Sequence, residues 1–420
     1  MQKKILILCH SHPDTDPRPN RMIHYLKDKY QVTVVGKSEV RIEGVQSIGL
    51  FRSLGDQKRL FKDAQERMRA NPLDNLIVMA GRTAMRWLMC LLFFPKAGAQ
   101  KLVRNIRLIL RQYDRIAWSQ LGRAKMVQDK LAGQHYDLVI SHDISLMPLV
   151  HRLVSDTTAK IMLDAREFYP KNFDDQWQWR LNVKPVNIYL CKTYLPYCDK
   201  VITVSRGLAD EYKWEFDADA DVVMSLPDYR DLSPSCINPE QIRIIHHGYA
   251  SYSRRTEVMI EMMDYVDERF SLDLMLPIGG AYYRKIVSMV NQRKNVRVLP
   301  SIPMQEIVPF TNQYDIGLFL CPPTNFNLMH ALPNKFFEFI QARLAVAIGP
   351  SIEMKGIVEQ YGCGIVSHDF NPLSLAQELN SLTPEKIMEY KQKSDLAAKH
   401  LNADANRKKI LSIVQDLLNE

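Results

Sequence analysis

The stretch that decides the fold is residues 331–349, which read ALPNKFFEFIQARLAVAIG. A proline stands just inside its start, and apolar residues then recur at helical spacing from Phe336 to Leu344. This pattern predicts an amphipathic helix of about three turns. Residues 345–348 are uniformly apolar and run to Gly349-Pro350, which predicts a buried strand stopped by a turn.

Two charged side chains share the polar side of the first turn of this predicted helix. Lys335 and Glu338 are three residues apart, and Asn334 stands at the helix start. Free backbone N–H groups and a cation suit a phosphate, and a carboxylate can accept hydrogen bonds from a ribose. The alternative is an exposed ion pair on an ordinary amphipathic helix, which contributes little to stability.

The run Pro333-Asn334-Lys335-x-x-Glu338, with the apolar strand after it, resembles the donor-nucleotide helix of retaining glycosyltransferases of the GT-B type (group 1, or family 4). That family commonly shows two glutamates separated by seven residues, and here the first position holds His330. The resemblance implies an α/β fold of two Rossmann-like domains that face each other across a cleft. It also implies that Glu338 binds the ribose of a nucleotide sugar. His330 is expected either beside the donor phosphate or sugar, or as a residue that lines the loop.

Length and composition indicate a globular protein of two domains. The chain has 420 residues, of which 46% are hydrophobic and 24% charged. Its seven cysteines form no C-x-x-C pair, so no zinc-finger spacing is present. The first residues lack the pattern of a secretory leader, and we therefore expect a reducing, cytoplasmic environment.

The net charge of +8 is concentrated in one segment. Residues 52–130 contain 17 Lys and Arg against 6 Asp and Glu, whereas the rest of the chain holds 38 against 41. An electrostatic partner is therefore expected to bind this segment. No nucleic-acid-binding motif accompanies the charge, so nucleic acid is not the expected partner.

The basic segment interrupts the alternation of strands and helices as a helical insertion. The apolar window 87–94 is far shorter than the ~20 residues that a spanning helix needs. After Pro95 we expect a helix whose two faces differ. Arginines occupy one face (Arg104, Arg107, Arg111, Arg115), and apolar residues occupy another (Ile106, Ile109, Tyr113, Ile116). This pattern is typical of a protein that lies on an anionic membrane surface, or of an insertion that packs its apolar side onto its own domain.

Polar residues gather after successive predicted strands of the first domain, for which we expect residues 1–225. The first strand, Ile5–Leu8, ends in a loop that contains Asp16-Pro17-Arg18, and a later strand ends at Ser141-His142-Asp143. Open parallel sheets bind ligands at this edge. The resemblance implies that Asp16, Arg18 and His142 act beside the transferred sugar. A turn before a helix cap and an ordinary loop histidine are the alternatives.

One further strand end departs from the family pattern. In the Asp-Ala-x-Glu run at 164–167, Arg166 stands where the family usually carries histidine. This substitution leaves the role of the position open.

A Pro-rich stretch at 226–240 predicts a linker, followed by a donor domain at 241–420 whose last helix is expected to cross back. The strand 242–247 runs into Gly248, a turn that the family follows with cations for the donor diphosphate. Here Tyr249 replaces the first cation, and Arg254 and Arg255 follow. Guanidinium groups suit phosphate oxygens. Family members also contact the nucleobase near residues 299–302.

The resemblance implies a glycosyltransferase that moves a sugar from a nucleotide-diphosphate donor to an acceptor hydroxyl, with retention. Arg254, Arg255 and Lys335 would stabilise the leaving diphosphate. We therefore expect no metal and no cofactor, and Asp14-Thr15-Asp16 has only the spelling of a metal motif. The expected partners are a glycan or lipid-linked acceptor and an anionic membrane, on the inner face of the cell membrane. A nucleotide-sugar 2-epimerase and a non-catalytic membrane-docking protein are the alternatives.

Overall fold

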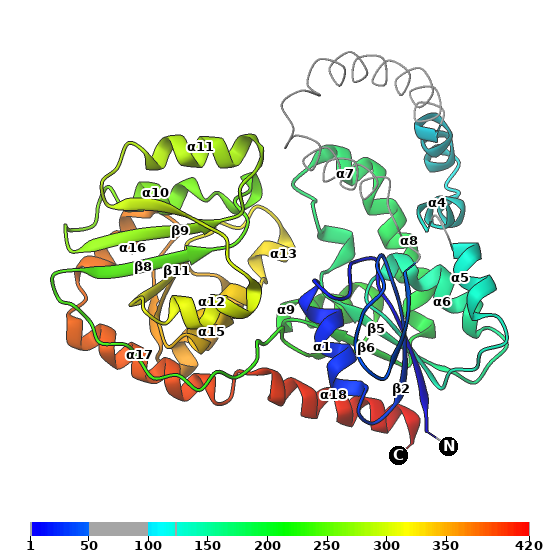
Figure 1. The fold of residues 1–420 in the computed structure, drawn as a ribbon. Helices are drawn as coiled ribbons and strands as arrows, with labels where there is room; N and C mark the ends of the chain where they lie inside the picture. The colour runs from blue at the N-terminus through cyan, green and yellow to red at the C-terminus, as the bar shows by residue number, and fades with distance from the viewer. Residues whose placement is uncertain (1, 50–99, 122–123, 420) are drawn as a thin grey trace, which may run out of the picture. The chain divides into compact units, whose positions relative to one another are not determined.

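The computed structural model describes residues 2–49, 100–121 and 124–419. Strands and helices alternate along them, and the strands form one sheet of seven strands and one of six (Figure 1). This confirms the predicted α/β fold with two Rossmann-like sheets. By internal contacts the chain divides into two compact units, 1–170 with 176–201 and 417–420, and 171–175 with 202–416. The predicted bounds of the domains and of the linker stay predictions.

The first sheet has the strand order β3-β2-β1-β4-β5-β6-β7. Its strands are β1 (Lys4–Leu8), β2 (Gln31–Gly36), β3 (Val45–Gly49), β4 (Leu138–Ser141), β5 (Lys160–Ala165), β6 (Lys200–Thr203) and β7 (Ala220–Val222). Strand β1 pairs in parallel with β2 and β4, and β4 pairs in parallel with β5. The apolar run of β1 is fully buried, as is typical of a parallel sheet covered on both faces. The carboxyl ends of β1, β4 and β5 therefore lie side by side at one edge.

The helices that accompany this sheet are α1 (Pro17–Leu26), α4 (Tyr113–Gln120), α5 (Ala124–Leu131), α6 (Met147–Val154), α7 (Trp177–Asn182), α8 (Lys184–Tyr194) and α9 (Arg206–Phe216). Residues 100–109 are helical as well.

The second sheet has the order β10-β9-β8-β11-β12-β13, and its pairs are parallel. Its strands are β8 (Ile242–His247), β9 (Phe270–Leu276), β10 (Val296–Pro300), β11 (Ile316–Phe319), β12 (Ala345–Ile348) and β13 (Gly364–Val366). Its helices are α10 (Glu257–Met262), α11 (Gly280–Val290), α12 (Met304–Thr311), α13 (Phe326–Met329), α14 (Asn334–Gln341), α15 (Ile352–Tyr361), α16 (Pro372–Asn380) and α17 (Pro384–Ala398). Helix α18 (Ala403–Leu418) follows them, and Nζ of its Lys409 donates to the carbonyl of Val222 in β7 at 2.7 Å.

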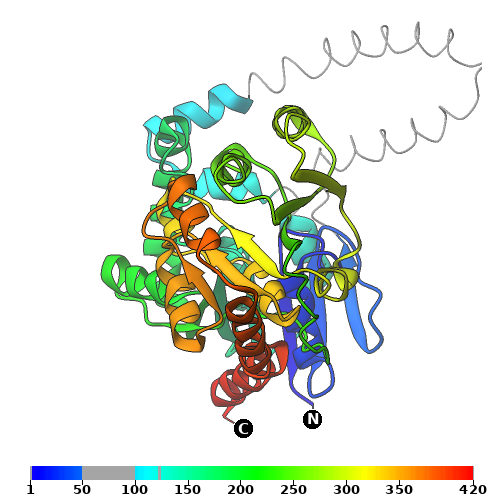
Figure 2. The same ribbon diagram turned by 90° about the vertical axis from the view of Figure 1, so that its left-hand side faces the viewer.

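Two apolar cores fill the two faces of the second sheet. One core packs α10, α11 and α16 against the sheet, and the other packs α12, α14, α15 and α17 against it. Figure 2 turns this unit toward the viewer and shows helices layered on both sides of the sheet. The sheet is thus covered on both faces, and its ligand-binding edge is set by the strand ends.

The stretch 331–349 folds as predicted into a helix and a strand, α14 and β12. Phe336, Phe337 and Ile340 are fully buried, which is what their spacing predicts. The helix has eight residues, or just over two turns instead of about three. It ends early because Arg343, just beyond it, adopts a left-handed φ of 59°.

The start of α1 requires a correction. The segment Asp16-Pro17-Arg18 is not a loop before the helix, since α1 begins at Pro17. Asp16 is the N-cap, and its side chain accepts a hydrogen bond from the backbone N–H of Arg18 at 3.4 Å. Proline fits the first helical position because its missing N–H would have no partner there. Strand β3 was not predicted from the sequence.

The predicted basic helix is interrupted, so the prediction of one continuous arginine face is wrong. Arg111 adopts a left-handed φ of 53°, which ends the helix at 100–109 before α4 starts at Tyr113. Ile116 is fully buried and belongs to no exposed apolar face. The apolar residues that are exposed here are Leu102, Val103, Ile106, Ile109 and Leu110. The window 87–94 lies outside the described residues.

Two buried cations anchor the segment 226–240 to the second unit. Arg343 is fully buried, and its Nη2 donates to the carbonyl of Arg230 at 2.7 Å. Lys391 is fully buried too, and its Nζ donates to Oγ of Ser235 at 2.8 Å. Because a buried charge is costly unless it is paired, these contacts hold the segment in place.

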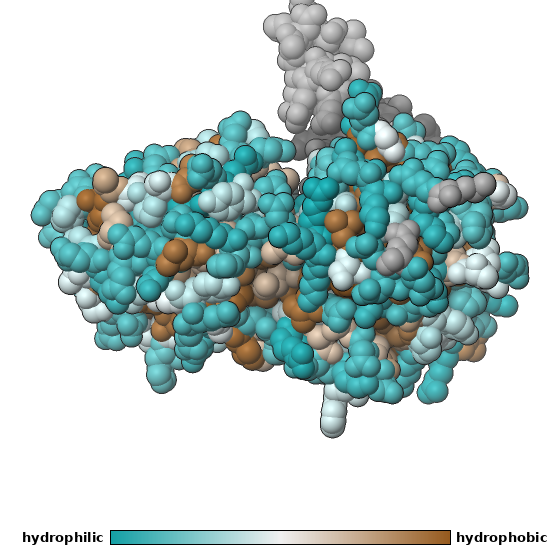
Figure 3. Space-filling view, turned by 90° about the horizontal axis from the view of Figure 1, so that it is seen from below, coloured by the Kyte–Doolittle hydropathy of each residue, from teal (hydrophilic) through white to brown (hydrophobic). Residues whose placement is uncertain are grey.

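In the described parts of the chain, no helix is both long and apolar enough to cross a membrane. The face of the molecule seen in Figure 3 is mostly hydrophilic, with hydrophobic residues in small groups. Such scattered groups are normal on a water-facing surface.

Candidate functional site

The first unit gathers polar residues at the carboxyl ends of β1, β4 and β5. Arg18 comes from the first turn of α1, His142 follows β4, and Asp164 lies near the end of β5. The three side chains, named here the Asp164 cluster, meet although they are far apart in the sequence. They lie at the edge where a parallel sheet is expected to bind ligands.

Asp164 is the centre of this cluster. Its carboxylate is fully buried, and Nε and Nη2 of Arg18 donate to it at 2.6–2.8 Å. Nδ1 of His142 lies 2.8 Å from its Oδ2. Burial acts to raise the pKa of Asp164, but the Arg18 guanidinium and then His142 hold that pKa well below its usual range. Asp164 is therefore a permanent anion that orients both partners.

A second ion pair lies beside the Asp164 cluster. Nη1 of Arg166 donates to Oδ2 of Asp16 at 2.8 Å. Burial acts to raise the pKa of the Asp16 carboxyl, but the Arg166 guanidinium keeps it lowered. Likewise, burial acts to lower the pKa of Arg166, and the charge of Asp16 raises it overall. The Arg166 guanidinium thus fixes Asp16.

The three residues predicted to act beside the sugar, Asp16, Arg18 and His142, are therefore brought to one edge of one sheet. Nε2 of His142 is buried, and no hydrogen-bond partner for it occurs among residues 2–49, 100–121 and 124–419. Sequence reasoning missed the role of Asp164. The sequence does contain a signal for this role: a carboxylate at the end of an otherwise apolar strand is buried and needs a partner.

In the second unit, Gly248, Arg254 and Lys335 converge. A Cβ atom built on Gly248 would lie 2.9 Å from Nζ of Lys335 and 4.0 Å from Nη1 of Arg254. Gly248 has a φ of 108°, which L side chains rarely adopt. Because glycine has no Cβ, the Lys335 ammonium can lie against the backbone of this turn, with the Arg254 guanidinium nearby. With His246, which contacts Lys335, these residues are named here the Lys335 cluster.

Lys335 is not a surface lysine, although the sequence placed it on the polar side of the helix. Its side chain is only 5% exposed because the first turn of α14 lies against the end of β8. Burial, and next the Arg254 guanidinium, lower the pKa of Lys335 to about 7. An anion that entered the cluster would reverse this effect by pairing with the ammonium group.

The other predicted donor residues lie around this cluster. Asn334 is the first residue of α14, whose N-cap Pro333 provides no side-chain hydrogen bond. Oε2 of Glu338 lies 3.4 Å from Nε2 of His247. Arg255 follows Arg254 and has a left-handed φ of 46°. Helix α14 thus offers uncapped N–H groups and a cation in its first turn and a carboxylate just beyond it.

His330 has different contacts from the other predicted donor residues. Its Nδ1 lies 3.0 Å from Oε1 of Glu353 in α15, and the same oxygen accepts from the backbone N–H of Gly207 at 2.8 Å. A Cβ atom on Gly207 would overlap the His330 ring. The structure thus gives His330 contacts that hold a loop, and its contact with a donor stays a prediction.

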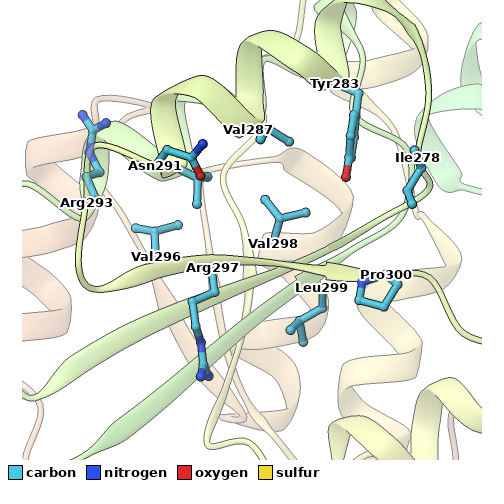
Figure 4. A pocket seen from close by; sticks show the side chains of 11 residues that line it. Ile278, Tyr283, Val287, Asn291, Arg293, Val296, Arg297, Val298, Leu299 and Pro300 are labelled. Carbon is cyan, nitrogen blue, oxygen red and sulfur yellow. The ribbon is translucent and has the colours of Figure 1, made fainter.

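A cavity of about 570 Å³ lies between α11 and the edge strand β10. Leu299 and Pro300, from the segment expected near a nucleobase, form one end of its wall, next to Ile278 (Figure 4). Figure 4 shows Tyr283 and Val287 on the helix side and Val296 and Val298 on the strand side. None of the residues predicted to bind the donor phosphate or ribose, or to act beside the sugar, lines this cavity.

No group of three or more His, Cys, Asp or Glu residues in the described ranges could hold a metal ion. The expectation that the protein needs no metal and no cofactor stays an expectation.

No protein-family model and no curated protein matches the sequence. The fold, in contrast, is similar to that of solved proteins. HepE from Anabaena, in complex with UDP-glucose, matches 98% of this chain and 99% of its own, with a TM-score of 0.62 and 12% identity. A glycosyltransferase from Rickettsia africae matches 99% of each chain, with a TM-score of 0.62 and 12% identity.

TarM from S. aureus matches over a smaller part. A variant of it, in complex with fondaparinux, α-GlcNAc-glycerol and UDP, matches 70% of this chain with a TM-score of 0.55 and 14% identity. This chain covers 58% of that protein, which is less than two thirds of its length. At these identities the likeness shows a shared fold of two Rossmann-like sheets.

Proposed function

We propose that the protein is a glycosyltransferase that moves a sugar from a nucleotide-diphosphate donor to an acceptor hydroxyl. The observation that carries the proposal is the convergence of Lys335 and Arg254 beside the backbone of Gly248. Glu338 lies just beyond the first turn of α14, three residues after Lys335, and can accept hydrogen bonds from a ribose. The fold neighbours add support, since their structures hold UDP-glucose or UDP.

The chemistry of such a donor matches these residues. Departure of the nucleoside diphosphate builds negative charge on phosphate oxygens, and cations fixed in advance stabilise it. Arg254 and Lys335 supply two positive groups that are already together beside Gly248. In the first unit, His142 and the pair Asp16–Arg166 would contact the sugar or the acceptor. We further propose retention of the anomeric configuration, which the resemblance of residues 333–338 supports.

Donor binding provides the first test. We expect one class among UDP-, GDP- and ADP-sugars to raise the melting temperature, since a ligand at 100 times its Kd stabilises by about 2.7 kcal/mol. Lys335→Met and Glu338→Ala should abolish or weaken that shift. Lys355→Met is the matched control, because Lys355 lies on the exposed side of α15 and forms an exposed ion pair with its helix neighbour Glu359. If no nucleotide sugar shifts the wild type, the proposal fails.

Product analysis separates transfer from the epimerase alternative. With donor alone, NMR should show no free epimerised nucleotide sugar, whereas with acceptor the nucleoside diphosphate and a glycosylated product should appear. The anomeric coupling constant of the product then reports retention or inversion. Epimerised donor without acceptor would overturn the transferase assignment.

We also propose that the protein contacts an anionic membrane and acts on a lipid-linked or cell-surface glycan acceptor at its inner face. Five apolar side chains of residues 102–110 are exposed, and Ile109 is 80% exposed. Nη2 of Arg104 donates to the carbonyl of Asn182 at 3.2 Å, which joins this segment to the end of α7. In α7, Trp177 and Leu181 are 61% and 64% exposed. Exposed apolar residues beside arginines suit the boundary of an anionic bilayer.

Vesicle sedimentation tests this surface. We expect binding to vesicles that contain phosphatidylglycerol, weaker binding to pure phosphatidylcholine, and a loss of about tenfold or more when Ile109 and Trp177 are both replaced by Ser. Trp214→Ser is the matched control, because Trp214 is 84% exposed in α9. Equal binding by both variants, or none by the wild type, would contradict the proposal.

A further inference from the structure

Strand β8 ends in two buried histidines, His246 and His247, for which the proposed reaction has no direct use. His246 is 2% exposed, so both ring nitrogens need partners inside the protein. Its Nδ1 lies 2.8 Å from the carbonyl oxygen of Leu318, and its Nε2 lies 3.2 Å from Nζ of Lys335. The ring therefore connects β11 to the first turn of α14.

These two contacts determine where the proton of the ring is. A carbonyl oxygen can only accept, so Nδ1 carries the hydrogen that is donated to Leu318. An ammonium group can only donate, so Nε2 must accept from Lys335. Burial, and next the charge of Lys335, keep the pKa of His246 well below its usual value, so the ring stays neutral. His246 is thus a neutral imidazole with a fixed acceptor at Nε2.

The acceptor restricts where the Lys335 ammonium can lie. A lysine side chain has four rotatable bonds, and it loses rotamer entropy when it is held in one place. With one N–H bound to Nε2, the group stays beside Gly248, where Arg254 also lies. The His246 ring therefore fixes the position of the Lys335 ammonium group before an anion binds.

We propose that His246 is a positioning residue, whose neutral ring holds the Lys335 ammonium where the donor diphosphate is received. The inference rests on the proposed function, because it names the support of its phosphate-binding cation. His246 itself would not touch the donor.

The titratable groups that face Lys335 come from several elements. They are His246 and His247 of β8, Arg254 after the turn at Gly248, Cys321 after β11, and Glu338 on α14. Lys335 loses its charge as the pH rises through its pKa of about 7. Anion binding should therefore take up a proton above that pH and weaken as the pH rises. Removing the acceptor at position 246 disfavours the ammonium form and moves this loss to lower pH.

Two substitutions of similar polarity separate the proposal from a general packing role. His246→Gln keeps a polar group that can accept at the position of Nε2. The shorter side chain of His246→Asn places its polar group only at the position of Nδ1, so no acceptor remains at the position of Nε2. We would measure inorganic pyrophosphate binding to the full chain by calorimetry from pH 6 to 9 in buffers without phosphate.

We expect H246Q to keep the wild-type affinity and pH profile. H246N should bind pyrophosphate about tenfold more weakly at pH 7, with its loss of affinity shifted to lower pH. Lys335→Met is the reference for a cluster without the cation. If H246N and H246Q share the wild-type profile, or lose affinity equally with no shift along pH, the proposal is overturned.

NMR of the protein keeps this inference distinct from the proposed function. In ¹³C spectra, the Lys335 side-chain signal, assigned by its absence in K335M, should titrate near pH 7 and at lower pH in H246N. In ¹⁵N spectra of the wild type, His246 should stay neutral with its proton on Nδ1 from pH 6 to 9. A charged ring, or a proton on Nε2, would refute the inference even if H246N does not fold. If nucleotides do not bind while these signals behave as expected, only the proposed function fails.

Discussion

Replacing Asp164 by asparagine should destabilise the first unit strongly. The carboxylate is fully buried and receives three hydrogen bonds from Arg18, a residue that is itself only 9% exposed. Asparagine has nearly the same shape, so no cavity forms and the change is one of charge. Removing one partner of a buried ion pair costs about 3–5 kcal/mol, because the other charge is left without compensation. We expect about 3 kcal/mol, since the amide oxygen can still accept one bond.

Urea unfolding at pH 7, followed by tryptophan fluorescence and circular dichroism, measures this loss. The matched control is Asp264→Asn, because Asp264 also binds an arginine, Arg293, through two hydrogen bonds but is 46% exposed. A solvated pair of this kind is worth about 0–1 kcal/mol. A double-mutant cycle with Arg18→Met gives the coupling between Asp164 and Arg18.

The pH dependence has a definite sign. The pKa of Asp164 lies below its unfolded value, so its contribution is complete above the unfolded pKa of about 3.9 and is lost as the pH falls below it. The stability difference between wild type and D164N should therefore be constant from pH 8 to 5 and shrink below about pH 4. A loss under 1 kcal/mol at pH 7, equal to that of the control, would refute the reasoning.

Two further changes test the second unit. Gly248→Ala should cost about 1–3 kcal/mol, because alanine is strained at a φ of 108°, and should weaken pyrophosphate binding in calorimetry. Gly356→Ala, in an open position of α15, should instead be neutral or stabilise by up to about 1 kcal/mol, and the opposite order would contradict this. Arg343→Met should lower the free energy of unfolding by about 3–5 kcal/mol in urea, because it leaves Asp395 and the carbonyl of Arg230 without their buried partner. Arg206→Met should change the free energy of unfolding by less than about 1 kcal/mol, because Arg206 is 79% exposed in its ion pair with Asp210.

The sequence predicts well what depends on local pattern. The apolar spacing of 331–349 gave α14 and β12 because burial of one helix face and of a short strand shows directly in residue order. The break at Arg111 escaped prediction, since no glycine or proline marks it and arginine rarely adopts a positive φ. The early start of α1 escaped because Asp16 can serve equally as a turn residue and as an N-cap.

The candidate site is predictable only in part. Position at strand ends identified His142, Arg18 and the turn at Gly248, because parallel sheets bind ligands at that edge. The contacts between these side chains could not be predicted. Arg18 and Asp164 are 146 residues apart, and nothing in either neighbourhood signals the other. The burial of Lys335 was missed for the same reason, because it depends on β8, which lies 89 residues away at His246.

The Asp164 cluster also bears on how related sequences can diverge. A single change at 18 or 164 strands a charge inside the protein, whereas two simultaneous apolar changes can be nearly neutral. In an alignment of relatives, columns 18 and 164 should therefore covary strongly. Position 142 should vary only in relatives that lack an aspartate at position 164.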